Sequence, residues 1–211
     1  KDRSQDLSYL LADAIEEAGG RVLLSTRAEH IEVEAGAVKG VRVSGGRVLP
    51  ARAVVSNASA AVTFQDMLPP GALTPEYLRK VSLYRPSISS FIVWLGLNRE
   101  IRGKIRGYST HVASGIGPEA AYKAAVNGEI DKGSFSVTLY DNLYKGYSRP
   151  GTSSVMLLCL TGYAPWRGFE GDYRAGRKEA YHAEKKRWAD TLIRRAESEV
   201  IPGLSSMIEV R

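Results

Sequence analysis

The chain has 211 residues, enough for one sizeable domain, or for one domain and part of another. Hydrophobic residues make up 44% and charged residues 25%, as in ordinary soluble globular proteins. The longest apolar stretches, such as Phe91–Leu95 and Val155–Leu160, are too short to span a bilayer, which argues against a transmembrane helix. The net charge of +6 permits attraction to an anionic surface, but it does not distinguish a membrane from nucleic acid.

The single cysteine, Cys159, lies in an apolar run and cannot form an intrachain disulfide. Its residue type and setting predict a small buried side chain in a protein of a reducing compartment, so we expect a cytoplasmic protein. Lys1 stands where an initiator methionine is expected, which predicts that the chain starts at a cut within a longer protein.

The first 58 residues predict a helix followed by a β-ribbon. Apolar residues follow the i, i+3, i+4, i+7 spacing of one buried helical face at Leu7, Leu10, Leu11, Ala14, Ile15 and Ala18. Gly19-Gly20 can supply the left-handed exit. Strands are expected at Arg21–Ser25, His30–Glu34, Val38–Ser44 and Arg47–Leu49, with glycine turns within the ribbon. A further buried strand is expected around Ala53–Val55.

The pattern changes after Leu68-Pro-Pro-Gly71, and the rest predicts an α+β unit with a mostly antiparallel sheet. A short helix is expected from Thr74-Pro75 to about Leu83. Long strands are expected, in one sheet, at Ile88–Leu97, Ser134–Tyr140 and Ser153–Thr161. A long helix is expected from Arg174 to Val200, ending at Pro202-Gly203. The boundary between the two parts is expected near Ala58–Pro69.

No catalytic constellation is evident in the sequence. The three histidines, His30, His111 and His182, lack metal-ligand spacing, so no metal site and no catalytic side chain are predicted. The segment Gly115–Ala120 fits the dinucleotide-binding pattern G-x-G-x-x-A. Because Thr110–Ser114 before it is a poor buried strand, we interpret the segment as the entry loop of a helix.

The order of several motifs carries a family resemblance. A helix ending Glu-Glu-Ala-Gly-Gly is followed by Arg-Val-Leu-Leu-Ser-Thr-Arg-Ala-Glu-His-Ile, then Gly40-Val-Arg-Val, then Ala53-Val-Val-Ser-Asn-Ala. This order resembles a segment of flavoproteins of the phytoene-desaturase, carotenoid-isomerase and amine-oxidase superfamily. The run Tyr84–Leu97 resembles the substrate-domain strand of the carotenoid branch, as does the later order Pro150-Gly, Trp166, Tyr173, Lys178 and a long helix. Asp2-Arg3 stand where the family usually has two glycines.

The resemblance implies an FAD-dependent oxidoreductase that desaturates, isomerises or saturates an apolar polyene, carotenoid or retinoid-like substrate. Residues 1–58 would be the middle part of an FAD-binding Rossmann-like domain, and residues 59–211 an incomplete substrate-binding domain. The backbone of Ala28 would lie at the adenine end of FAD, and Ser56, Asn57 and Ala58 where the chain leaves the cofactor domain. A polyene has no polar handle, so its site needs apolar and aromatic walls. Candidates for these walls are Phe91, Trp94, Tyr140, Met156 and Leu158.

The family's N-terminal G-x-G-x-x-G unit and its C-terminal glycine-rich flavin segment have no match in the 211 residues. We therefore expect FAD in the parent protein but none bound to this fragment, which should be inactive alone. Two alternatives stay open: an amine-oxidase-like flavoprotein with a polar substrate, and a non-catalytic lipid-binding or interaction module.

The expected partners are an apolar small molecule and no nucleic acid. A peripheral membrane contact is also considered, because residues 173–195 carry eight cations against three anions. A basic helix bearing Trp188 could lie on anionic lipid. In the alternative interpretation, the charged face is merely solvated and Trp188 packs inward on the sheet.

Overall fold

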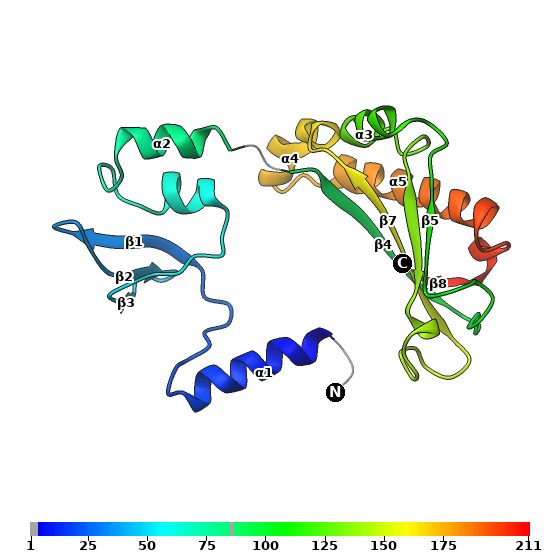
Figure 1. Cartoon of the computed structure of the whole chain (residues 1–211), viewed down its shortest axis with the longest axis horizontal. Helices are drawn as coiled ribbons and strands as arrows, with labels where there is room; N and C mark the ends of the chain where they lie inside the picture. Colours follow the sequence, from blue (N-terminus) through cyan, green and yellow to red (C-terminus); the bar gives the residue numbers. More distant parts are fainter. Residues whose placement is uncertain (1–3, 85–86) are drawn as a thin grey trace. The chain divides into compact units, whose positions relative to one another are not determined.

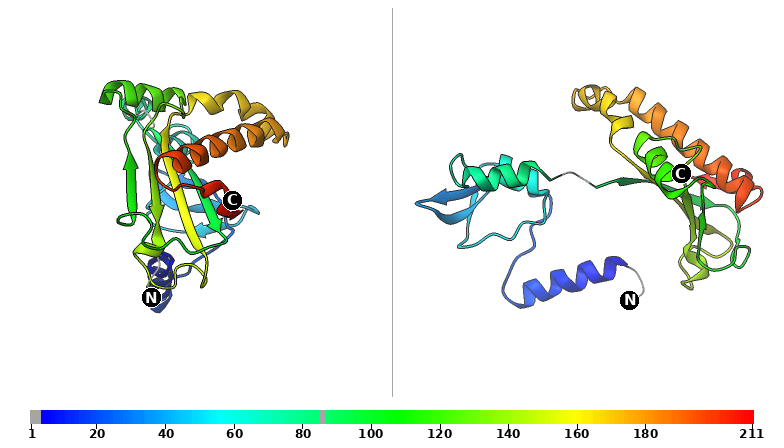
Figure 2. Two further views of the ribbon diagram at one scale, coloured as in Figure 1. Left: turned by 90° about the vertical axis from the view of Figure 1, so that its right-hand side faces the viewer. Right: turned by 45° about the horizontal axis from the view of Figure 1, so that its top comes forward.

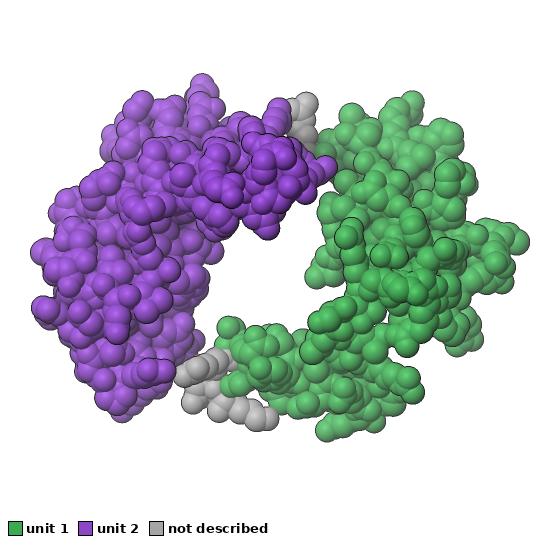
Figure 3. Space-filling view, turned by 180° about the vertical axis from the view of Figure 1, so that it is seen from behind, with its two compact units in different colours: residues 1–86 green, residues 87–211 purple. Residues whose placement is uncertain are grey.

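The computed structural model describes residues 4–84 and 87–211. The Asp2-Arg3 departure from the family pattern lies outside the described residues. The chain forms two compact units, residues 1–86 and 87–211, which Figure 3 shows in different colours. The functional boundary predicted between Ala58 and Ser59 stays a prediction, and the segment that follows it belongs to the first compact unit.

The first unit contains the predicted helix and ribbon. Helix α1 spans Ser4–Glu17, and strands β1 (Ala28–Glu34), β2 (Ala37–Val43) and β3 (Val48–Pro50) form an antiparallel sheet in chain order. The β1–β2 turn uses Ala35 and Gly36, both with positive φ. Periodicity and turn residues therefore predicted this part correctly.

Two strands predicted in the first unit do not form. Arg21–Ser25 and Ala53–Val55 are irregular, and Leu24 and Val55 are 82% and 99% exposed. A strand needs a neighbour to satisfy its backbone hydrogen bonds, and residues 4–84 pair neither segment. The apolar stripe of α1 is also uncovered, since no residue of α1 is buried. The sequence-based expectation of burial for these segments was wrong for this chain.

The remainder of the first unit packs on the ribbon. A π-helix, η1, spans Val62–Asp66, and helix α2 spans Pro75–Ser82. The Thr74 hydroxyl caps α2 by accepting a hydrogen bond from the Tyr77 amide, and the helix starts where the sequence predicted it. The Met67 carbonyl accepts a hydrogen bond from the Ile31 amide, which ties the end of η1 to β1. The small core consists of Ile31, Val43, Met67 and Val81.

The second unit is built on a five-stranded antiparallel sheet. Its strands are β4 (Ser89–Leu97), β5 (Ser109–Val112), β6 (Phe135–Leu139), β7 (Ser153–Thr161) and β8 (Ile208–Val210), in the order β5-β6-β7-β4-β8. The three strands predicted here share one sheet, so this prediction and the α+β class are confirmed. The two short edge strands, β5 and β8, were not predicted.

Helix α5 spans Glu179–Glu199 and lies across one face of this sheet (Figures 1 and 2). It begins later than predicted because Gly176 adopts φ +82°, which separates it from the short helix α4 (Glu170–Arg174). Trp188 is 1% exposed and packs in the core, so the inward orientation is correct. Its other buried apolar residues are Leu192, Ile193 and Ala196.

Shorter helices complete the second unit. They are α3 (Pro118–Asn127) and the 3-10 helices η2 (Tyr140–Asn142), η3 (Ala164–Phe169) and η4 (Leu204–Met207). Helix α3 approaches the end of β7 closely, since a Cβ atom on Gly162 would lie 2.4 Å from the Val126 carbonyl oxygen. Among residues 4–84 and 87–211, no helix combines the length and apolarity needed to cross a membrane.

Candidate functional site

Side-chain alternation divides the sheet of the second unit into two faces. Val93, Leu95 and Leu97 of β4 are buried toward α5, as are Val155 and Leu157 of β7. The intervening residues point to the opposite face. We call that face the open face and define it by Ile92, Trp94, Met156, Leu158 and Leu160. Trp94 lies opposite Met156, and Ile92 opposite Leu158, so the side chains form a continuous apolar strip.

The open face brings together four of the five predicted substrate-wall residues. Trp94, Met156 and Leu158 belong to it directly. Tyr140 joins them from the end of β6, because its ring stacks on Trp94 at 5.8 Å and its hydroxyl lies 3.9 Å from the Met156 sulfur. Phe91 lies on the opposite face. There it packs against Trp166 and Trp188, with centroids 5.8 and 5.3 Å away.

Two tyrosines extend this wall beyond the sheet. Tyr147 stacks on Tyr140 with a centroid separation of 5.2 Å, and Tyr144 stacks on Tyr147 at 6.3 Å. The interplanar angles along the row are 17°, 29° and 27°. We call Trp94, Tyr140, Tyr147 and Tyr144 the aromatic ladder. Tyr144 and Tyr147 were not predicted, although three tyrosines within eight residues directly after a strand were a readable signal.

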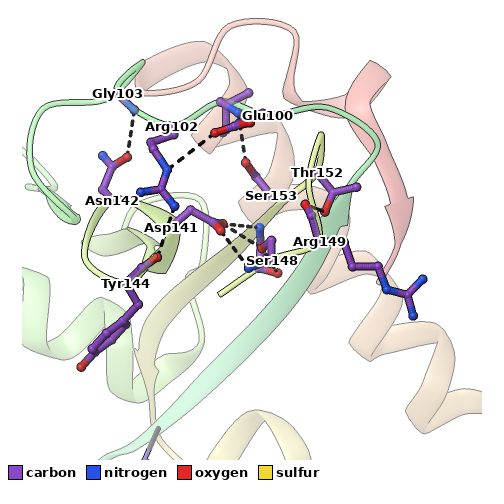
Figure 4. Close-up of polar contacts among 12 residues, drawn as sticks. Glu100, Arg102, Gly103, Asp141, Asn142, Tyr144, Ser148, Arg149, Thr152 and Ser153 are labelled. Carbon is purple, nitrogen blue, oxygen red and sulfur yellow. Dashed lines mark hydrogen bonds and ion pairs between the residues drawn. The ribbon is translucent and has the colours of Figure 1, made fainter. Parts of the chain in front are cut away.

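A buried carboxylate fixes the loop that carries the ladder (Figure 4). Asp141 is 3% exposed and accepts hydrogen bonds from the Ser148 amide at 3.0 Å, the Ser148 hydroxyl at 2.9 Å and the Ser154 amide at 2.9 Å. Asp141 follows Tyr140 and Ser148 follows Tyr147. These bonds therefore hold two neighbouring rings of the ladder at a fixed spacing.

Asn142 joins the same loop to residues 98–108 (Figure 4). Its side-chain oxygen accepts a hydrogen bond from the Gly103 amide at 2.9 Å, and its nitrogen donates to the carbonyls of Ile105 and Gly107. The Ser153 hydroxyl accepts a further bond from the Ile101 amide at 3.0 Å. The two loops therefore form one connected surface.

This two-loop surface is strongly basic. Its exposed cations are Arg99, Arg102, Lys104, Arg106, Lys145 and Arg149. Glu100 is the exposed carboxylate within residues 98–108 and 143–152, and it pairs with Arg102 at 3.6 Å. Leu143 and Tyr144 are exposed on the same surface.

A hollow lies at the end of the sheet away from the aromatic ladder. It has a volume of about 600 Å³ and is lined mainly by Phe91, Trp166, Phe169, Tyr173 and Tyr181. Glu170, Arg174 and Lys185 also line it, and Glu170 and Arg174 form an ion pair. The single carboxylate there is thus already neutralised by its neighbour.

The predicted cofactor-side residues belong to the first unit. Ala28 begins β1 opposite Val43 and is an exposed residue. The Ser56 hydroxyl bonds the Thr63 hydroxyl at 2.7 Å and accepts from the Ala58 amide at 3.3 Å. Ser56 and Ala58 line a small cavity of about 300 Å³, whereas Ala28 and Asn57 lie outside it. The structure therefore does not bring these four residues into one site.

The Gly115–Ala120 motif and Cys159, which the sequence analysis also considered, have structural roles. Gly117 caps α3 with Pro118 in its first turn, and β5 before it is an antiparallel edge strand. The helix-entry interpretation of Gly115–Ala120 is therefore confirmed. Among the described residues, no group of three or more His, Cys, Asp and Glu side chains could hold a metal. Cys159 is buried, and this burial raises the pKa of its thiol to about 11.

Comparison with known proteins defines the class. The chain belongs to the flavin containing amine oxidoreductase family, whose pattern matches residues 4–181. It is similar to phytoene desaturase (lycopene-forming) of Pantoea ananas, 31% identical over 83 residues, covering 39% of this chain and 17% of that protein. It is also similar to 4,4'-diapophytoene desaturase (4,4'-diapolycopene-forming) of Methylomonas sp, 35% identical over 96 residues, covering 44% and 18%.

A third relative aligns along nearly the whole chain. Prolycopene isomerase, chloroplastic, of Daucus carota is 23% identical over 207 residues, which cover 95% of this chain and 30% of that protein. The chain therefore spans less than a third of the length of the three relatives named here.

FAD fits the described residues only in part. Ala28 is an exposed residue with a minimal side chain, which suits recognition through its backbone N–H and C=O groups. A pyrophosphate is held by a tight turn from a parallel strand into a helix. The Gly115–Ala120 loop follows an antiparallel strand instead, so it does not fit that role.

Proposed function

We propose that the chain is the substrate-side part of a longer FAD-dependent oxidoreductase that acts on an apolar polyene of the carotenoid type. The observation that carries the proposal is the open face, where Trp94, Tyr140, Met156 and Leu158 form one apolar wall. A conjugated hydrocarbon is recognised by the shape and apolarity of its site, because it offers no hydrogen-bonding group. The carotenoid substrates in the names of the relatives support the same class.

In this proposal, FAD supplies the hydride chemistry when it is bound. The residues of this chain orient the polyene along the open face and exclude water from it. The relatives named above include desaturases and an isomerase, which supports desaturation or isomerisation. Saturation stays an expectation of the sequence resemblance alone. The apolar character of the open face favours a polyene over a polar substrate at this face. The aromatic hollow lined by Phe91, Trp166, Phe169, Tyr173 and Tyr181 is the feature that favours the amine-oxidase-like alternative, because aromatic rings bind cations.

The cofactor proposal separates the 211 residues from the longer protein. We expect the purified 211-residue chain to be colourless and to have no redox activity, because no described turn fits the FAD pyrophosphate. The longer protein should be yellow. Protein-bound flavin typically absorbs at about 450 nm. Such a band in a stoichiometric complex of the 211 residues with FAD would refute this expectation.

The substrate proposal is tested in the longer flavin-bound protein with phytoene. Replacing Trp94 by Ala removes the most exposed aromatic ring of the wall and should lower kcat/KM by about tenfold or more. Tyr122→Ala, at an exposed site on α3, is the matched control and should leave kcat/KM unchanged. Turnover of an amine but of no polyene would replace the proposal by the amine-oxidase alternative. A colourless longer protein that binds lipid would support the non-catalytic module.

We also propose a peripheral membrane contact through the two-loop surface rather than through α5. Trp188 is buried and cannot anchor to lipid, and Lys186, Arg187 and Arg195 are paired with carboxylates of α5 itself. The two-loop surface combines six exposed cations with the exposed side chain of Leu143, a composition suited to an anionic lipid surface.

Vesicle sedimentation at low salt tests this contact. The chain should sediment with vesicles containing phosphatidylglycerol and much less with pure phosphatidylcholine. Replacing Lys104, Arg106 and Lys145 together by Ala should abolish the difference, whereas Lys186→Ala, which removes an ion-paired cation, should not. Equal recovery with both lipids would disprove the contact.

A further inference from the structure

The aromatic ladder extends the wall of the open face from the sheet onto the loop that follows β6. Its four rings are stacked in a row, with centroid separations of 5.8, 5.2 and 6.3 Å. We propose that the ladder is the contact surface for one end of the bound polyene and determines how long a substrate the site prefers. This inference rests on the proposed function and names the residues that would make the enzyme selective for substrate length.

The geometry of the rings suits a conjugated chain. The rings are near-parallel but offset, with centroids 5.2–6.3 Å apart and interplanar angles of 17–29°, so their edges and part of their faces are left for other contacts. Ring edges carry partial positive charge, and π systems present negative faces, so an edge-to-face contact is favourable. A polyene lying along Trp94 and Met156 would therefore meet a row of ring edges when it passes beyond the sheet.

The exposure of the ladder supports a ligand surface. Trp94 is 49% exposed at one end and Tyr144 is 40% exposed at the other. Rings that served only to pack the loop would bury their surface, as Trp188 does. The exposed rings instead continue the strip of Ile92, Leu158 and Leu160, so apolar surface runs from the sheet to the loop.

The loop that carries the outer rings is held by polar contacts on its other side. Asp141 and Ser148, the residues that follow Tyr140 and Tyr147, are joined directly by hydrogen bonds. Ser148 also bonds the Ser154 hydroxyl at 3.0 Å, which attaches the loop to β7. Asp141 is therefore a positioning residue: its hydrogen bonds to Ser148 (Figure 4) fix the spacing of Tyr140 and Tyr147, the residues that precede the two partners.

Selectivity between two substrates of different length tests the inference in the longer flavin-bound protein. Phytoene serves as the long substrate and retinol, about half as long, as the short probe whose binding is followed by its fluorescence. Tyr144→Leu should lower kcat/KM for phytoene by about tenfold and leave the Kd of retinol unchanged within about twofold. Tyr147→Leu should act in the same direction.

Three further variants separate the effect of the rings from other causes. Tyr147→Phe retains the ring and should preserve the preference for phytoene, which separates ring stacking from the hydroxyl. Asp141→Asn should raise KM for phytoene more than it lowers kcat, because it misplaces the rings without touching the reacting bonds. Tyr122→Leu, at a tyrosine of α3 that is more exposed than Tyr144 (58% against 40%), should change neither kcat/KM for phytoene nor the Kd of retinol.

The outcomes separate this inference from the function on which it rests. If the wild-type protein binds and turns over no polyene, both the proposed function and the ladder inference are wrong. If the wild type acts on phytoene but Tyr144→Leu and Tyr147→Leu affect both substrates equally, or neither, only the ladder inference is overturned.

Discussion

Removal of the Asp141 carboxylate should destabilise the second unit by an amount that the hydrogen bonds allow us to state. In Asp141→Ala the amides of Ser148 and Ser154 lose their acceptor, while the Ser148 hydroxyl keeps its bond to the Ser154 hydroxyl. An unsatisfied buried donor costs about 1–3 kcal/mol. We therefore expect the free energy of unfolding to fall by about 3 kcal/mol.

The assay can report the second unit alone. All three tryptophans, Trp94, Trp166 and Trp188, belong to it, so tryptophan fluorescence in a urea titration follows its unfolding. Asp141→Asn keeps one acceptor oxygen and should lose about 2 kcal/mol. Asp172→Ala, which removes an exposed carboxylate paired with Arg177, should cost less than about 1 kcal/mol. A loss below about 1 kcal/mol in Asp141→Ala would show that water replaces the carboxylate and would refute the reasoning.

Three other outcomes follow from the packing and charges of the second unit. Gly162→Ala should destabilise it by about 1–3 kcal/mol, since the new Cβ meets backbone atoms, whereas Gly168→Ala, with open space around it, should stay within about 0.5 kcal/mol by the same fluorescence assay. Ellman's reagent at pH 8 should leave Cys159 unmodified in the native chain and modify it in urea, because the raised thiol pKa and burial both suppress reaction; rapid native modification would contradict this. A hydrogen bond from Arg187 lowers the pKa of Glu184 from 4.5, so its stabilising contribution is present above that value and is lost as pH falls through the folded pKa. Glu184→Gln should weaken the fall of the free energy of unfolding as the pH drops through this range. An unchanged pH dependence in Glu184→Gln would contradict this role of Glu184.

The second unit was largely predictable because its elements pair with one another. The alternation in Ile88–Leu97 and Ser153–Thr161 reflects a sheet with α5 on one face, and these strands find their partners within residues 87–211. In the first unit, the same kind of apolar signal at Arg21–Ser25 and Ala53–Val55 predicted strands that do not form. Periodicity reports what a segment can bury, while the formation of a strand also requires a neighbouring strand.

The candidate site was predictable only where it follows strand periodicity. Trp94, Met156 and Leu158 alternate with core residues, so their common face could be inferred from spacing alone. Tyr144 and Tyr147 lie on a loop, whose path depends on the contacts of Asp141 and Asn142 with residues distant in sequence. The run of three tyrosines indicates aromatic residues near the end of β6, but no local pattern encodes the contacts that place Tyr144 and Tyr147 in the ladder.

The order of the strands has a consequence for the kinetics of folding. Strand β4 is the first strand of the second unit to be synthesised, but in the sheet it lies between β7 and β8. Strand β8 is the last strand of the unit and ends at Val210. Leu97 pairs with Ser153, and Gly96 with Val210, so both edges of β4 stay unpaired until much of the unit has been synthesised. Non-local pairing of this kind slows folding, because the entropy of loop closure is lost before the stabilising contacts form. The sheet should therefore complete only once its last strand is available, and β4 is the segment most exposed to premature association during synthesis.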